Sequence, residues 1–186
     1  MILSFVLCFS SLVSSSDVPI IDSNSRFHPV FGSLGMVVSQ EQVASEIGAA
    51  ILTKGGNAID AAVATGFALA VTLPRAGNLG GGGFMVIHLA DSKDTITIDY
   101  REMAPIAATT EMFLDESGEV DNKKAQYSIY SSGVPGTVAG LLYAHEKFGS
   151  LSLAEVITPA IDLAKNGIEV SICLLYTSPS PRDSFR

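Results

Sequence analysis

An alanine-rich stretch between Asn57 and Pro74 constrains the fold more than any other feature of this sequence. Asn57 is a favourable N-cap and Pro74 cannot continue a helix, so the pattern predicts a helix between them. The stretch is apolar nearly all round, which is typical of a helix that is buried on every side. Its small residues also allow another layer to approach closely.

The segments on either side of this helix predict further elements. Residues 36–38 are a short strand candidate, and a helix comes next with Ser39 as its N-cap and Gln42 at capping-box spacing. Gly55 and Gly56 end that helix. Its apolar residues recur at helical spacing and predict one buried face: Val43, Ile47, Ala50 and Ile51.

Downstream, residues 84–89 and 95–100 predict an antiparallel hairpin, because the second run alternates polar and apolar residues. Residues 137–147 predict a helix that ends near Gly149. A last helix begins after Ser152, which forms a capping box with Glu155. Pro159 lies inside that helix and is expected to kink or divide it.

A run of glycines fills most of residues 77–83. A phosphate-binding loop would follow a strand, open a helix and supply a Lys, whereas this run follows a helix, opens a strand and has no Lys nearby. We therefore predict that the backbone here passes close to another backbone or to a ligand, where a side chain cannot fit.

Composition narrows the class of protein. Hydrophobic residues make up 47% of the 186, which excludes a disordered chain, and the net charge of −8 argues against nucleic-acid binding. Neither Cys8 nor Cys173 supports a disulfide framework. The histidines lack metal-ligand spacing and are interpreted as structural or surface residues: His28, His88 and His145. We expect no metal and no organic cofactor.

The two ends differ from the middle of the chain. Residues 1–16 are a short apolar run followed by serines, the layout of a signal peptide, although a buried strand or a truncated anchor remains an alternative. Residues 17–171 are predicted to form a single partial domain. Residues 172–186 lack any period and contain two Ser-Pro pairs, so we interpret them as a non-native or disordered tail.

Arg101 is the candidate binding residue, because it stands at the end of an apolar strand. Its planar guanidinium fork suits a carboxylate. The alternative is a structural ion pair with Asp99 or Glu102.

Four blocks together resemble the γ-glutamyltransferase (γ-glutamyl transpeptidase) family, in its order and spacing. They are residues 48–62, 78–85, 99–105 and 133–140. The resemblance implies an α+β N-terminal-nucleophile hydrolase fold, an αββα sandwich, which would be incomplete in this chain. It also implies that Arg101, in the Arg-Glu-x-Ala-Pro motif, binds the α-carboxylate of the γ-glutamyl group.

The resemblance also implies a reaction, a partner subunit and a location for the parent protein. A precursor cuts itself, and the Thr exposed at the start of the small subunit attacks glutathione or another γ-glutamyl amide. Water, an amino acid or a dipeptide then accepts the acyl group. That Thr is absent from this chain, so no catalytic residue is assigned here and the chain alone is expected to be inactive. The parent is expected to be secreted, periplasmic or at the cell surface.

Three alternatives stay open. One is an acylase or amidase of the same superfamily, and another is an inactive truncated isoform that acts by binding. A nucleotide-binding protein is the third, and the missing Lys after the glycines argues against it.

Overall fold

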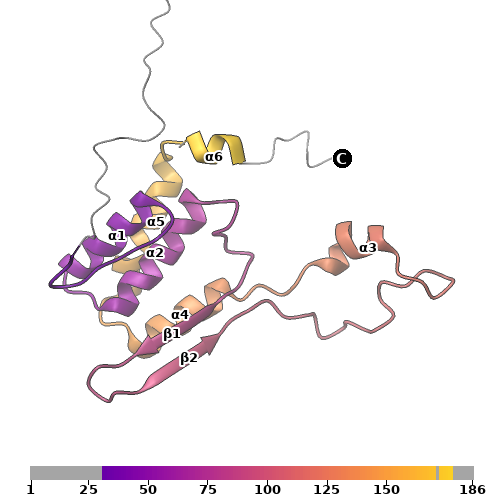
Figure 1. Ribbon diagram of the computed structural model, residues 1–186, viewed down its shortest axis with the longest axis horizontal. Helices are drawn as coiled ribbons and strands as arrows, with labels where there is room; N and C mark the ends of the chain where they lie inside the picture. The colour runs from indigo at the N-terminus through magenta and orange to yellow at the C-terminus, as the bar shows by residue number, and fades with distance from the viewer. Residues whose placement is uncertain (1–30, 171, 178–186) are drawn as a thin grey trace, which may run out of the picture. The chain divides into compact units, whose positions relative to one another are not determined.

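The computed structural model describes residues 31–170 and 172–177. The chain divides into two units, Met1–Ser33 and Leu34–Arg186, and nearly all of the described residues lie in the second. This second unit is an α+β arrangement (Figure 1). In chain order the elements are α1 Gln42–Thr53, α2 Ala58–Thr72, β1 Phe84–His88, β2 Thr95–Asp99, α3 Asn122–Tyr127, a 3₁₀ turn Ile129–Ser131, α4 Thr137–Phe148, α5 Leu153–Asn166 and α6 Ile172–Thr177.

Helix α2 is the centre of the core and contacts α1, α4 and α5. Its start is fixed by a capping box, in which the Asn57 side chain accepts from the Asp60 amide and the Asp60 carboxylate accepts from the Asn57 amide. The predicted N-cap is confirmed. Most of the helix is buried as predicted, but one side, with Ala58 and Ala62, is exposed, so it is not buried on every side. The main core cluster draws on four helices: Ile51, Ala61, Val63, Ala64, Phe67, Leu141, Val156 and Ala160.

Helix α1 differs from the prediction at its start. Glu41 is the N-cap and its side chain makes no capping hydrogen bond, so the capping box expected from Ser39 and Gln42 is wrong. The Ser39 hydroxyl instead donates to the Glu41 carbonyl at 2.8 Å and lies 2.8 Å from the Ser45 hydroxyl. These bonds place Ser39 outside the helix, too early in the chain to act as its cap.

The buried face of α1 is also rotated from the predicted one. Ala44, Gly48 and Ile51 are buried, whereas Val43 is 41% exposed. A Cβ on Gly48 would overlap the Thr65 hydroxyl of α2, so the two helices meet where a side chain is missing. The face with the smallest residue is the buried one, because it permits the closest approach.

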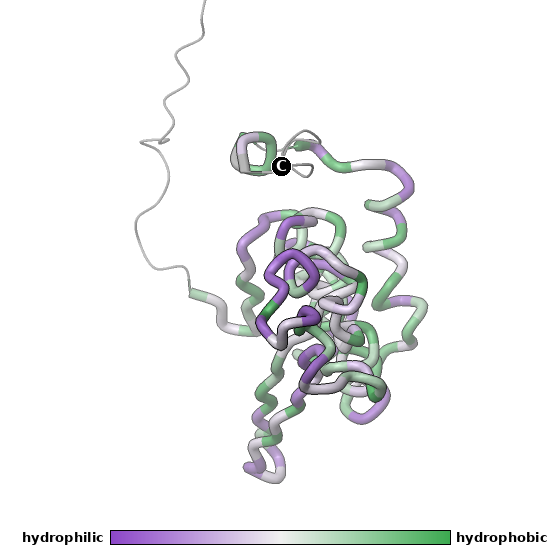
Figure 2. Tube along the Cα trace, turned by 90° about the vertical axis from the view of Figure 1, so that its right-hand side faces the viewer, coloured by the Kyte–Doolittle hydropathy of each residue, from purple (hydrophilic) through white to green (hydrophobic). Residues whose placement is uncertain are grey.

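The predicted hairpin is confirmed. β1 and β2 pair antiparallel, with Phe84 opposite Asp99 and His88 opposite Thr95. Ile87 is buried and the β2 residues alternate between half-buried and exposed, as expected. Figure 2 shows the hairpin's polar tip beyond its alternating strands. Residues 36–38, by contrast, form no strand, although Val37 does pack against the helical core.

For the C-terminal helices α4 and α5, the predicted ends are correct, but the predicted break at Pro159 is not. The capping box of Ser152 and Glu155 is confirmed, and Gly149 follows the last residue of α4. Pro159 does not divide α5, which is a single continuous helix. The Thr158 hydroxyl donates to the Ala154 carbonyl at 2.6 Å, whereas the carbonyl that lacks the proline N–H is that of Glu155, one residue later.

Between β2 and α4 the chain makes a long excursion that carries α3 (Figure 1). Its base is closed by a bridge between Met103 and Val134. Towards the C-terminus, the first residues of the predicted tail form α6, in which Leu174 is buried. Whether residues 172–186 are native stays a prediction, and residues 1–16 lie outside the described part.

In the part of the chain that the structure describes, no helix is both long and apolar enough to cross a membrane.

Candidate functional site: a carboxylate-binding turn

The turn after β2 is held by the glycine run from one side. A Cβ added to Gly82 would lie 2.6 Å from the Tyr100 carbonyl oxygen and 2.7 Å from the Glu102 amide nitrogen. No side chain fits in that space, because the neighbouring atoms belong to the backbone. The predicted close approach at the glycines is therefore confirmed, and its partner is the chain around Arg101.

The start of α4 holds the same turn from the other side. The Gly81 carbonyl accepts from the amides of Gly136 and Thr137, at 2.8 and 2.9 Å. Helix starts leave such N–H groups without partners inside the helix, so this carbonyl satisfies two of them. A Cβ on Gly140 would overlap the Tyr100 ring, and one on Gly136 would overlap the Tyr100 carbonyl.

Three of the four motif blocks thus meet around Tyr100, Arg101 and Glu102. The bridge at Met103 and Val134 adds two backbone hydrogen bonds, of 3.4 and 2.8 Å, just beyond the turn. Burial raises the pKa of the Tyr100 phenol above its ordinary value of 10.0, so this half-buried ring, which is neutral at physiological pH in any case, stays neutral to higher pH.

Arg101 lies exposed at the centre of this assembly. Its amide donates to the Asp99 carboxylate at 3.0 Å. Among the described residues its guanidinium makes no ion pair, so the structural pair with Asp99 or Glu102 is not observed. The fork is therefore available to a ligand.

Arg101 borders a cavity of about 660 Å³ with mostly apolar walls. Such a pocket, with few polar groups, is typical of small-molecule sites. None of its described lining residues is Ser, Thr, Cys, His or Lys, and Arg101 is the one cation among them, a group suited to recognition of a carboxylate. The lining is Ile98, Asp99, Tyr100, Arg101, Met103, Ala104, Ile106, Val134, Pro135, Gly136, Ala139, Gly140 and Tyr143.

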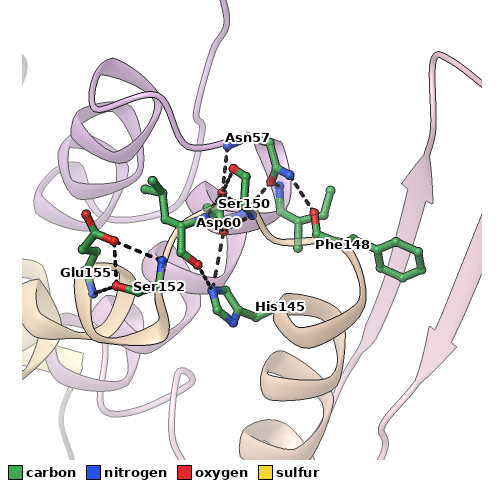
Figure 3. Close-up of polar contacts among 9 residues, drawn as sticks. Asn57, Asp60, His145, Phe148, Ser150, Ser152 and Glu155 are labelled. Atoms are coloured by element: carbon green, nitrogen blue, oxygen red, sulfur yellow. Dashed lines mark hydrogen bonds and ion pairs between the residues drawn. The ribbon is translucent and has the colours of Figure 1, made fainter.

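A second polar cluster surrounds Asp60, which the sequence analysis did not single out (Figure 3). Its side chain is fully buried. The Ser150 hydroxyl donates to it at 2.6 Å, and the amides of Ser150 and Leu151 donate at 3.1 to 3.4 Å. Burial raises the pKa of the carboxyl, but these hydrogen bonds outweigh that effect and the pKa is lowered overall.

His145 belongs to this cluster. Its Nε2 lies 3.0 Å from the Leu151 carbonyl oxygen and 3.6 Å from an Asp60 oxygen, and its side chain is 12% exposed. The structural role predicted for His145 agrees with this position, while His88 is exposed on the hairpin and His28 lies outside the described residues. Within residues 31–170 and 172–177, no group of three His, Cys, Asp or Glu residues is placed to hold a metal.

The sequence contained a signal for the cluster. Asp60 is the one acidic residue in an otherwise apolar helix, and a buried carboxylate needs partners. One partner, the Asn57 amide of the capping box, is local, but the others lie about 90 residues away, and no local pattern links those to it.

Solved structures of known proteins share this fold. A solved structure of gamma-glutamyltranspeptidase from Helicobacter pylori matches with a TM-score of 0.77 and 49% identity, over 80% of this chain and 43% of that chain. The gamma-glutamyltranspeptidase family model matches residues 44–186. The chain belongs to this family, and the resemblance carried by the four blocks is confirmed.

Two relatives show the breadth of the family. Glutathione hydrolase proenzyme of Escherichia coli is 48% identical over 169 residues, which is 90% of this chain and 29% of the relative. Acylase ACY 1 proenzyme of a Pseudomonas strain is 44% identical over 149 residues, 77% of this chain and 26% of the relative. The chain therefore spans less than a third of either relative.

Proposed function

We propose that this chain forms the donor-binding part of an enzyme that transfers or hydrolyses the γ-glutamyl group of glutathione and related amides. The Arg101 guanidinium carries the proposal, because it has no ion-pair partner among the described residues and lies on a rigid turn at the edge of an apolar pocket. Arg101 binds the donor's α-carboxylate through two parallel hydrogen bonds and so fixes its register.

The rest of the parent protein supplies the chemistry in this proposal. An N-terminal Thr of a small subunit, cut from the same precursor, attacks the γ-amide carbonyl with its own α-amine as base. The γ-glutamyl ester forms as the C–N bond breaks, and the donor's amine leaves with the proton. Water, an amino acid or a dipeptide then takes the acyl group. The two parts complete the αββα sandwich. Family membership supports this assignment of roles, as does a pocket whose described lining contains a cation but no Ser, Thr or Cys.

The test uses the matured full-length protein and a chromogenic γ-glutamyl anilide. Arg101→Ala removes a charge-assisted pair worth about 1.5–3 kcal/mol, so KM should rise roughly 10- to 100-fold. Arg101→Lys keeps the charge but loses the planar guanidinium fork, so its KM should lie between those of the wild type and Arg101→Ala. An unchanged KM in Arg101→Ala would contradict the assigned role.

An acylase acting on another side-chain acyl group is the second candidate, supported by the identity to acylase ACY 1 proenzyme. The anilide of 4-aminobutyric acid differs from the γ-glutamyl anilide only by lacking the α-carboxylate, and it separates the two. A γ-glutamyl enzyme should prefer its own anilide, and this preference should shrink in Arg101→Ala. Equal turnover of both anilides by the wild type would favour the acylase.

We further propose that the parent protein is exported and that residues 1–16 are removed. The apolar run and the serines after it support this. Mass spectrometry of the protein recovered from its native compartment would show a new N-terminus near residue 17, and an intact Met1 would contradict export by cleavage.

A further inference from the structure

Helix α4 is fixed at both of its ends. At its C-terminal end, the Asn57 side-chain amide donates to the Phe148 carbonyl at 2.6 Å (Figure 3). At its N-terminal end, the Gly81 carbonyl accepts from two amides. The helix has 12 residues and is therefore about 18 Å long. Backbone groups at both termini thus find partners in other elements.

Asp60 accepts most of the side-chain hydrogen bonds that hold the C-terminal end of α4. Its two oxygens accept from the Ser150 amide, the Ser150 hydroxyl and the Leu151 amide, which form the turn directly after α4. His145, in the last turn of the helix, faces the same carboxylate at 3.6 Å. The carboxylate is wholly buried, and these donors satisfy its hydrogen-bonding capacity. It therefore anchors the end of the helix and does not bind a ligand.

The N-terminal end of α4 fixes the turn that carries Arg101. Gly140 and Gly136 lie directly against Tyr100, so that any added Cβ would overlap it. Between the two ends, a Cβ on Gly66 of α2 would lie 3.1 Å from Leu141, which marks close packing along the helix. A close-packed helix moves as a unit, and a shift at Asp60 reaches the turn through it.

We propose that Asp60 is a positioning residue for donor binding: by fixing the C-terminal end of α4, it sets the place of the Arg101 turn at the other end. The inference rests on the proposed function and adds a residue to it. Arg101 binds the donor's carboxylate away from the scissile bond, so its misplacement weakens ground state and transition state alike. The signature is a raised KM with little change in kcat.

A double-mutant cycle tests this in the matured full-length protein, with the γ-glutamyl anilide as substrate. Asp60→Asn keeps the shape but removes the charge, and we expect KM to rise roughly 3- to 30-fold. Once Arg101→Ala is present, Asp60→Asn should add nothing to KM, because the group that it positions is gone. Asp162→Asn, at an exposed site on α5, is the matched control and should leave both constants unchanged.

Two outcomes would overturn the inference. One is an unchanged KM in Asp60→Asn. The other is that Asp60→Asn raises KM by the same factor in the wild type and in Arg101→Ala, which would indicate general structural damage. If Asp60→Asn does not fold, Ser150→Ala removes one donor and enters the same cycle under the same criteria. Wild-type protein without γ-glutamyl turnover would instead overturn the proposed function itself, and this inference with it.

Discussion

At the residue scale, the glycines of one run are not equivalent. A Cβ on Gly82 would meet backbone atoms at 2.6 to 2.8 Å, whereas one on Gly80 would meet only the Asn78 side chain at 3.6 Å. The run predicted close approach because no residue other than glycine tolerates it. Which glycine makes the contact could not be predicted, because that depends on the turn at Tyr100, which is distant in sequence.

Gly82→Ala should therefore destabilise the protein by about 1–3 kcal/mol, because neither backbone can move aside freely. Gly80→Ala is the matched control and should be nearly neutral. Urea unfolding of the two variants in the full-length protein would compare them. Equal unfolding midpoints would contradict the close contact at Gly82.

At the element scale, the sequence predicted helices best where their caps are local. Asn57 and Ser152 each form a capping box with a residue three positions later, and both boxes are present. The face that α1 buries was not predictable in the same way. Its own periodicity indicated Val43 and Ile47, but the choice depends on the missing side chain of Gly48 facing α2.

Ser152→Ala should lower the unfolding free energy by about 1 kcal/mol, because the Glu155 amide loses its acceptor. Ser152→Thr retains the hydroxyl and serves as the control. Thermal unfolding of the full-length protein would report both. A Ser152→Ala protein as stable as the wild type would show that the cap contributes nothing.

At the scale of the whole molecule, the C-terminal end of α4 is held by contacts between segments about 90 residues apart, such as Asp60 with Ser150. The family resemblance identified Arg101, since its motif is contiguous in the chain. It did not identify Asp60, because a carboxylate in an apolar helix indicates a partner without saying which. Long-range polar contacts of this kind are visible only in the folded structure.

The lowered pKa of Asp60 makes stability depend on pH. The carboxyl has an ordinary value of 3.8, and the folded state holds it lower, so its contribution is complete above that value. As the pH falls below about 4, the unfolded state takes up a proton first and the contribution is lost. His145 is the titratable group that faces it at 3.6 Å.

The melting temperature of wild type should therefore fall more steeply below about pH 4 than that of Asp60→Asn. The exposed carboxyls of Asp115 and Glu155 also have lowered pKa values, through hydrogen bonds from Ser117 and Ser152. Both proteins share those two groups, and the Asp60 charge is the smallest of the causes acting on the pKa of Glu155, so the difference between the curves reports mainly on Asp60. Parallel curves would contradict its contribution.

The Tyr100 ring, wedged between Gly83 and Gly140, has a consequence for how sequences of this family diverge. A larger residue at position 140 needs the space that the ring occupies, and a smaller residue at position 100 leaves a void beside the helix. Either change made alone should destabilise the protein. Family members that differ at one of these two positions are therefore expected to differ at both, so that positions 100 and 140 covary in an alignment of the family.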